Sequence, residues 1–151
     1  MPLTLNVRLM TPTAMLPTRG SALAAGYDLY ADQATVIPAR GRAKVTTGIQ
    51  LELVRPVSEQ KDASFAYMLK LQPRSGLSVK GIDIGAGVVD EDYRGQVMVI
   101  MINGTDQPIA VAVGDRICQM VINKVYTPAI ELVTDLSETT RGDGGFGSTG
   151  V

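Results

Sequence analysis

The alternation of apolar and polar residues with a period of two limits most strongly what this chain can fold into. Apolar residues alternate with polar ones from Leu3 to Leu9, and every second residue from Phe65 to Leu71 is large and apolar or aromatic. Successive side chains of a β-strand point to opposite faces, so this pattern is typical of half-buried strands. Apolar stripes with helical spacing longer than two turns are hard to find, and the sequence therefore predicts a β protein. Further short strands are expected at Tyr27–Ala31, Val36–Ile37, Ala43–Thr46, Ile49–Val54, Ile109–Val113, Ile117–Val121 and Ile130–Val133.

Turn-forming residues separate the expected strands at intervals of roughly 8 to 12 residues. They include Pro38 to Gly41, Asn103-Gly104 and Gly114-Asp115. Such spacing is typical of a β-sandwich, a jelly roll or a small barrel. The run from Val97 to Ile102 is apolar at every position, which predicts a strand covered on both faces or lying in a subunit interface. A chain of 151 residues is long enough for one compact core, and no interdomain linker stands out.

The chain contains no histidine and a single cysteine, Cys118. This composition excludes Ser/His/Asp and Cys/His catalysis, zinc sites built from histidine or several cysteines, and any intrachain disulfide. The neighbours Ile117 and Met120 indicate that Cys118 is buried packing material. Any chemistry must therefore use carboxylates, hydroxyls, arginines, backbone amides and, where one is needed, a hard cation.

Charge and hydropathy exclude two classes of partner. The formal net charge of −1 provides no basic surface for duplex phosphates, so no nucleic-acid partner is expected. No apolar run reaches the roughly 18 to 20 residues that a membrane span needs, so no membrane partner is expected. Asn6 and Arg8 interrupt the apolar pattern of Met1–Met10, which predicts neither a signal peptide nor an anchor. We expect an intracellular protein, cytoplasmic or nuclear.

Three segments carry residue types that suit phosphate chemistry. In the first, Pro73 to Leu77, Arg74 and Ser75 precede Gly76. A guanidinium fork, a hydroxyl and an unshielded backbone amide can together hold phosphate oxygens. A polar turn after a strand is the alternative interpretation of these five residues.

The second segment, Gly85 to Gly95, begins like a dinucleotide-binding fingerprint. Asp90 stands where the third glycine would be and no βαβ unit surrounds it, so the Rossmann interpretation fails. We expect a hairpin, in which one of Asp90, Glu91 and Asp92 faces inward as a general base and the others lie in solvent. A charged hairpin tip is the alternative.

The third segment is the end of the chain, Arg141 to Val151, which contains five glycines. It cannot form a core of its own, so its composition predicts a mobile tail. The segment also suits an arm that closes over a ligand, with Phe146 stacked on a planar ring and Arg141 offsetting phosphate charge. Both interpretations stay open on these residues alone.

Taken together, the segments resemble one family, the homotrimeric deoxyuridine triphosphate pyrophosphatases (dUTPases). Five motifs stand in the family's order, and the spelling of the third and fifth resembles the eukaryotic and large-virus branch. The resemblance implies a jelly-roll subunit in a homotrimer, with residues 1–140 as the domain and residues 141–151 as an arm that closes over a neighbouring active site. The motifs are Ala25–Ala31, Pro73–Leu77, Gly85–Gly95, Gly114–Met120 and Arg141–Gly150.

The resemblance also implies a reaction and its residues. Asp90 would activate the water that attacks the α-phosphorus of dUTP, releasing dUMP and pyrophosphate, and Asp28 would place Mg²⁺ through coordinated water. This reaction keeps uracil out of DNA and supplies dUMP for thymidylate synthesis. The implied substrate-binding residues are Arg74, Ser75, Gly76, Gln119 and Arg141 for the phosphates; Gly87, Val88, Val89 and Asp90 for the uracil edge; Tyr93 for the deoxyribose; Phe146 for stacking on the ring; and Met98, Gly147 and Ser148 in addition.

The residue chemistry agrees with this reaction, because in-line attack on phosphorus needs a positioned water, a base and positive charge rather than histidine. Two segments depart from the family pattern. Ser78–Asp83 is one residue shorter and lacks a histidine after Lys80, and Arg55–Ala63 is longer than in compact members. We expect the longer segment to be a solvated loop.

Two alternatives to a dUTPase remain. One is the related deoxycytidine triphosphate deaminase, which shares the fold, and the other is a catalytically silent relative that binds a regulatory partner. The complete arm and the Gly87 to Tyr93 segment favour dUTP hydrolysis over the deaminase. The presence of Asp90 together with Arg74, Ser75 and Arg141 argues against a silent protein.

Overall fold

The computed structural model describes residues 2–145, and nearly every regular element in this range is a strand. Two short helices interrupt the strands: a 3₁₀ helix, η1 (Val57–Glu59), and α1 (Ser75–Val79). Within the same range, no helix is long and apolar enough to cross a membrane. The strands are β1 (Thr4–Leu9), β2 (Tyr27–Tyr30), β3 (Thr35–Ile37), β4 (Arg42–Thr46), β5 (Ile49–Val54), β6 (Phe65–Gln72), β7 (Ile82–Gly85), β8 (Val88–Asp90), β9 (Met98–Asn103), β10 (Ile109–Val111) and β11 (Arg116–Tyr126).

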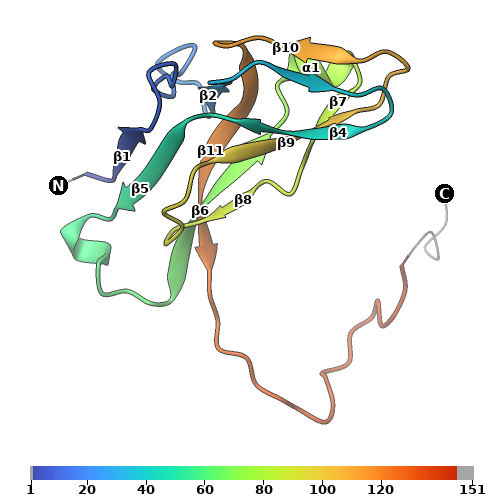
Figure 1. Ribbon diagram of the computed structural model, residues 1–151. Helices are drawn as coiled ribbons and strands as arrows, with labels where there is room; N and C mark the ends of the chain where they lie inside the picture. Colours follow the sequence, from blue (N-terminus) through green and yellow to red (C-terminus); the bar gives the residue numbers. More distant parts are fainter. Residues whose placement is uncertain (1, 146–151) are drawn as a thin grey trace.

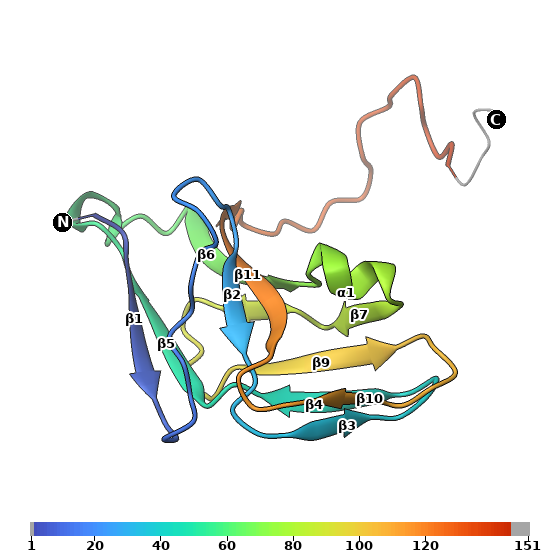
Figure 2. The same ribbon diagram turned by 90° about the horizontal axis from the view of Figure 1, so that it is seen from above.

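Two antiparallel sheets enclose the core (Figures 1 and 2). One has the strand order β2-β11-β6-β8 and the other β4-β9-β7, while β1-β5 and β10-β3 form separate pairs. The all-β sandwich predicted from the sequence is therefore confirmed. Core side chains come from both sheets and include Leu29, Leu71, Met120, Val45, Val99 and Met101.

The period-two pattern produces the burial that it predicts. In β6, Phe65, Leu69 and Leu71 are buried as the pattern predicts, whereas Tyr67 on the same face is only half-buried, like Ala66, Met68 and Lys70 on the other face. The pattern breaks in β11, where the register against β2 shifts between Arg116 and Cys118, so that adjacent residues at 117 and 118 are both buried. Because a bulge changes the direction of the side chains that follow it, this one affects where the side chain of the next residue, Gln119, points.

The Gly85–Gly95 segment differs from the expected hairpin. β7 pairs with β9, whereas β8 pairs with β6, so the chain crosses from one sheet to the other at Ala86-Gly87. Both crossing residues have positive φ, 58° for Ala86 and 91° for Gly87. The alternation in the sequence predicts strands but not their partners, and this is why the hairpin prediction is wrong.

The body of the structure ends near Thr127, whose amide donates to the Ser64 carbonyl at 3.0 Å. The described residues that follow run away from the body in both views (Figures 1 and 2). The strand expected at Ile130–Val133 does not form, and Ile130 and Leu132 are fully exposed. An apolar run cannot hold a strand without a partner to pair with, so this prediction is wrong for the single chain.

The apolar run at β9 is buried on one face only. Val99 and Met101 point into the core, while Met98, Ile100 and Ile102 on the opposite face are half-buried. The sequence predicted a strand covered on both faces or one lying in a subunit interface. In the single chain the second face of β9 is only partly covered, so the first of these is wrong and the second stays a prediction.

Candidate active site

Residues of the first, second and fourth motifs meet in one pocket of about 480 Å³, here called the Asp28 pocket. Asp28 comes from β2 and Gln119 from the neighbouring strand β11. Ser75 and Gly76 begin α1, where a Cβ on Gly76 would meet no atom within 4 Å, so its backbone is open to a ligand. The full lining is Gly20, Ala24, Ala25, Gly26, Asp28, Arg74, Ser75, Gly76 and Gln119.

Two guanidinium groups lie beside Asp28: Arg74 lines this pocket, and Arg116 lines the neighbouring one. The Arg74 Nε lies 2.9 Å from Asp28 Oδ1, and the Arg116 Nη1 lies 3.5 Å from Asp28 Oδ2. Two guanidinium groups therefore face one carboxylate. Such a surplus suits an anion with several oxygens, because guanidinium groups bind phosphates through paired donors. Sequence reasoning did not single out Arg116, although it stands inside the fourth motif.

Packing holds Gln119 beside this pocket. Its Nε2 donates to the Pro73 carbonyl at 3.1 Å. A Cβ on Gly26 would lie 2.5 Å from the Gln119 Oε1 and 3.2 Å from the Gln119 Cβ, so a larger residue at position 26 would force the Gln119 side chain to shift. The first and fourth motifs therefore pack directly against each other at this point.

Residues of the third motif and β9 form a second pocket of about 370 Å³, here called the Asp90 pocket. Its walls are mainly apolar and Asp90 is the one carboxylate among its lining residues. The Tyr93 hydroxyl donates to the Gln96 carbonyl at 3.0 Å, which fixes the ring at the rim. Lys44 also lines the pocket, although the sequence did not suggest it. The full lining is Lys44, Val88, Val89, Asp90, Tyr93, Gln96, Val97, Met98 and Ile100.

The two pockets lie far apart within one chain. Asp28 is on β2 and Asp90 on β8, the opposite edges of one sheet, so three interstrand steps of about 4.8 Å separate them. Asp28 pairs with Gln119, which pairs with Gln72, whereas Asp90 pairs with Met68. The four residue-to-residue steps from Met68 to Gln72 add about 14 Å along the strand, giving a separation of about 20 Å between Asp28 and Asp90.

Arg141 lies outside both pockets. It is exposed, and its Nε donates to the Gly144 carbonyl at 2.8 Å, a contact within its own segment. The other predicted arm residues, Phe146, Gly147 and Ser148, lie outside the described residues.

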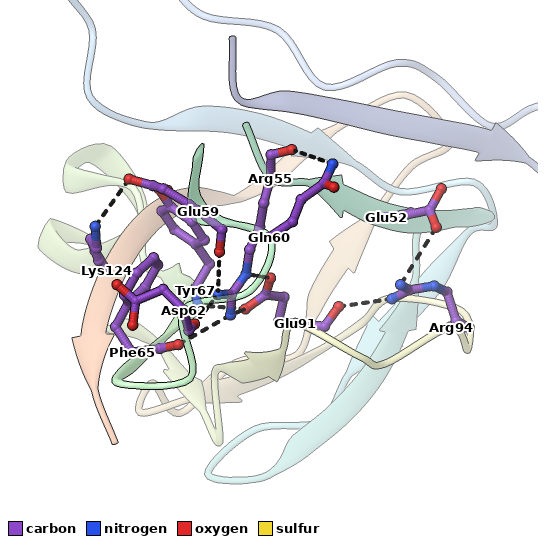
Figure 3. A network of polar contacts seen from close by, with 10 residues as sticks. All are labelled: Glu52, Arg55, Glu59, Gln60, Asp62, Phe65, Tyr67, Glu91, Arg94 and Lys124. Carbon is purple, nitrogen blue, oxygen red and sulfur yellow. Dashed lines mark hydrogen bonds and ion pairs between the residues drawn. The ribbon is translucent and has the colours of Figure 1, made fainter. Parts of the chain in front are cut away.

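A third cluster of polar contacts, missed from the sequence, includes Glu91, the residue that follows Asp90 in the chain (Figure 3). Arg55 forms a two-pronged ion pair with Glu91, and the Tyr67 amide donates to the same carboxylate at 2.8 Å. The hydrogen bonds from Arg55 hold the pKa of the Glu91 carboxyl below its ordinary value. The prediction of a solvated Arg55–Ala63 loop is wrong at its first residue, because the Arg55 side chain is only 17% exposed.

The family model for dUTPase matches residues 13–150, nearly the whole chain. The chain belongs to the dUTPase family. Curated relatives named deoxyuridine 5'-triphosphate nucleotidohydrolase include the rice protein, 49% identical over 97% of this chain and 81% of the relative. The Saccharomyces cerevisiae relative is 45% identical over 97% of this chain and 94% of its own length. Plants and yeasts supply these relatives, so the eukaryotic-like resemblance of the dUTPase motifs is confirmed.

Solved dUTPase structures share the fold. The Staphylococcus bacteriophage 80alpha dUTPase, in complex with dUpNHpp, has a TM-score of 0.83 and 25% identity over 98% of this chain and 99% of that one. A mutant dUTPase from phage phi11 of S. aureus, which coordinates a structural Mg(II) ion, has a TM-score of 0.74 and 24% identity over 87% of this chain and 97% of that one. The jelly-roll-like architecture predicted from the resemblance is therefore confirmed.

Proposed function

We propose that this dUTPase family member hydrolyses dUTP to dUMP and pyrophosphate inside the cell, in the cytoplasm or the nucleus, keeping uracil out of DNA and supplying dUMP for thymidylate synthesis. The observation that carries the proposal is the division of the motif residues between two unlike pockets. The Asp28 pocket offers the Arg74 guanidinium and an open backbone, with a second guanidinium, Arg116, beside Asp28, and these groups suit a triphosphate. The Asp90 pocket has apolar walls and one carboxylate, as a nucleoside beside a general base requires.

In the proposed reaction Asp90 accepts a proton from a water whose oxygen attacks the α-phosphorus. The bond between that phosphorus and the oxygen bridging to the β-phosphorus breaks, and pyrophosphate leaves with its electron pair. Val88, Val89 and the Gly87 backbone would contact the uracil, while Tyr93 and Met98 would bound the sugar side. Little covalent chemistry falls to the protein in such a displacement, so positioning decides the rate.

The proposed phosphate contacts come from Arg74, Ser75, Gly76 and Gln119, with Arg141 adding charge from the arm. Phe146, Gly147 and Ser148 are proposed to cover the bound nucleotide. Each phosphate oxygen would then meet a donor or a positive charge, which is the main stabilisation that phosphoryl transfer needs.

The donor set of the Asp28 pocket fits Mg²⁺ held chiefly by substrate. Asp28 is the one carboxylate among the lining residues, and residues 2–145 contain no group of three metal-ligating side chains. Mg²⁺ typically binds triphosphate oxygens and keeps several waters, with one or two protein carboxylates nearby. Asp28 would hold the hydrated ion through water, and the ion, when bound, would neutralise charge on the phosphate oxygens.

The separation of about 20 Å between the pockets supports a homotrimer with shared sites. One α-phosphorus cannot reach Asp90 and the Asp28 pocket of the same chain together, so each site would combine pockets from different copies. The half-covered apolar face of β9 and the exposed apolar residues Ile130 and Leu132 offer surfaces for such an assembly.

Turnover of single nucleotides tests the proposed reaction. With Mg²⁺ present, we expect pyrophosphate from dUTP and none from dCTP, dTTP or UTP. Ammonia from dCTP would instead identify a deaminase, and no turnover of any nucleotide would identify a binding protein. Asp90→Asn should bind a non-hydrolysable dUTP analogue normally but lose roughly 10²- to 10⁴-fold in kcat. Asp92→Asn, two residues away and outside the Asp90 pocket, is the matched control and should retain activity.

Subunit mixing tests the shared site separately. Arg74→Ala and Asp90→Asn each inactivate one half-site, so either variant alone should be nearly inactive. When the two are unfolded together and reassembled in equal amounts, random pairing leaves roughly one site in four with both halves intact. Recovery near a quarter of the wild-type rate supports sharing, whereas no recovery would place both halves in one chain.

A further inference from the structure

Asp90 occupies a weakly supported position in the fold. It is the last residue of β8, a strand of three residues that pairs with β6 at the edge of its sheet. Short edge strands have ladder hydrogen bonds on one side only and fray readily at their ends. The location of the Asp90 carboxylate therefore depends on what holds the acidic turn, residues Asp90 to Tyr93, in which the Tyr93 amide donates to the Asp90 carbonyl at 3.1 Å.

Glu91 ties this turn to the sheet. The ladder between β8 and β6 ends where Asp90 pairs with Met68. One residue further along β6, the Tyr67 amide donates to Glu91 Oε2 at 2.8 Å. The Glu91 side chain thus takes the place that the next strand residue would have filled, and it extends the ladder beyond Asp90.

Arg55 in turn holds Glu91. Its Nε donates to Glu91 Oε1 and its Nη2 donates to Glu91 Oε2 at 2.6 Å (Figure 3). The same guanidinium donates to the carbonyls of Asp62 at 2.9 Å and Phe65 at 3.1 Å, and it lies 4.7 Å from the centre of the Phe65 ring. These contacts hold the Arg55 guanidinium in one orientation.

Burial distinguishes this ion pair from ordinary surface pairs. The side chains of Arg55 and Glu91 are 17% and 19% exposed, whereas those of the Arg40–Asp106 pair are 65% and 78% exposed. Shielded pairs lose less of their attraction to water and salt than exposed pairs do. The two-pronged geometry also fixes the direction of both side chains.

We propose that Arg55 is a positioning residue for Asp90, acting through Glu91 to hold the acidic turn where Asp90 can take a proton from water. Both Asp90 and Glu91 line a larger cavity of about 840 Å³ that Arg55 also lines, but of the two only Asp90 lines the Asp90 pocket, where the nucleoside is proposed to bind. Glu91 can therefore fix the turn without touching the substrate. On this proposal the longer Arg55–Ala63 loop supplies the residue that positions Asp90, the candidate base. This inference rests on the proposed function, because it takes Asp90 as the base.

The first test separates turnover from binding. Arg55→Gln removes the charge and the fork, and kcat for dUTP should fall roughly 10- to 100-fold, since small displacements of a reacting group cost this much. The KM for dUTP and the affinity for a non-hydrolysable analogue should stay at the wild-type values, because no substrate contact is removed. Arg55→Lys keeps the charge but not the fork and should recover part of the loss. Glu91→Gln should behave as Arg55→Gln does, and the double variant should be no worse than either alone.

Tyr67→Phe is the matched control. It removes the hydroxyl that donates to Glu59 Oε2 at 2.8 Å, yet it keeps the backbone amide that donates to Glu91. It perturbs the same loop without breaking the Arg55–Glu91 link, so kcat should not change. An equal loss in Tyr67→Phe and Arg55→Gln would overturn the proposal, because general loop packing would then explain both.

Hydrogen exchange gives a readout that does not depend on activity. In Arg55→Gln the amides of Tyr67 and Tyr93 should exchange faster than in the wild type, and in Tyr67→Phe they should not. Unchanged exchange in Arg55→Gln, or an unchanged kcat, overturns the proposal. If the wild-type protein hydrolyses no dUTP, the proposed function fails, while exchange still decides whether Arg55 holds the turn. If Arg55→Gln does not fold, Glu91→Gln supplies the same measurements.

Discussion

Replacing Gly87 by alanine tests whether the crossing between the sheets depends on a missing side chain. Gly87 is buried, has a φ of 91°, and lies where its Cβ would approach the Leu71 carbonyl oxygen to 2.7 Å. The Leu71 amide also donates to the Gly87 carbonyl at 2.7 Å. Because Leu71 lies inside β6 and pairs with Met120 of β11, its carbonyl cannot retreat freely.

The expected loss of stability follows from these two contributions. A left-handed conformation costs alanine about 1–2 kcal/mol relative to glycine. The contact with Leu71 forces the two backbones apart and weakens the hydrogen bond between them, which adds about 1 kcal/mol or more. Gly87→Ala should therefore destabilise the protein by about 3 kcal/mol, and a loss of this size in a chain of 151 residues lowers Tm by about 6–12 °C.

Gly114→Ala separates the two contributions. Gly114 has a φ of 84°, but the nearest atom to its Cβ would be the Met15 sulfur at 4.0 Å, so alanine there meets the backbone penalty without a collision. Urea unfolding at one fixed protein concentration should give a loss of about 1–2 kcal/mol for Gly114→Ala and a larger one for Gly87→Ala. Equal losses would refute the steric account of the crossing.

Three further predictions concern the arm, the cysteine and the acid response. Deleting residues 141–151 should greatly reduce the rate of dUTP hydrolysis but leave the number of subunits in the assembly, measured by light scattering, unchanged. An unchanged rate would show that the arm is only a tail. Burial raises the pKa of the Cys118 thiol to about 12, so iodoacetamide at about pH 8 should modify it only after unfolding, and rapid modification of the folded protein would contradict its burial. Because the Glu91 pKa lies below its ordinary value of 4.5, its contribution to stability should be complete above that pH and decline as the pH falls through the lower folded-state value. The unfolding free energy should therefore fall less steeply with acidification in Glu91→Gln than in the wild type, and identical slopes would contradict the ion pair.

The strands were predictable because their evidence is local. Alternation from Phe65 to Leu71 fixes which side chains face inward whatever the partner strand, and β6 forms there. Pairing is not local, so Gly85–Gly95 was expected to fold back on itself although its two strands join different sheets. The sequence also cannot state whether an apolar run finds a partner, and this explains the absent strand at Ile130–Val133.

The candidate site was predictable to the extent that its motifs could be recognised. Asp28, Arg74 and Gln119 come from three motifs and line one pocket, while the roles that the resemblance implies for them stay predictions. Arg55 could not be found in this way, because its role depends on a contact with Glu91, 36 residues later, across a loop that departs from the family pattern. Local composition made this loop look solvated, and only tertiary structure shows the guanidinium beneath it.

The exposure of Asp90 in the single chain connects catalysis with assembly. A carboxylate works best as a base where bulk water is excluded, yet Asp90 lies open at a sheet edge about 20 Å from the positive charges that would hold the phosphates. One chain can neither shield Asp90 from water nor bring it closer to these charges, because the positions of Asp28 and Asp90 are fixed by the same sheet. A second copy can do both by laying its Asp28 pocket against the acidic turn. On this argument activity should fall with dilution in step with dissociation of the assembly, and a fully active monomer would refute it.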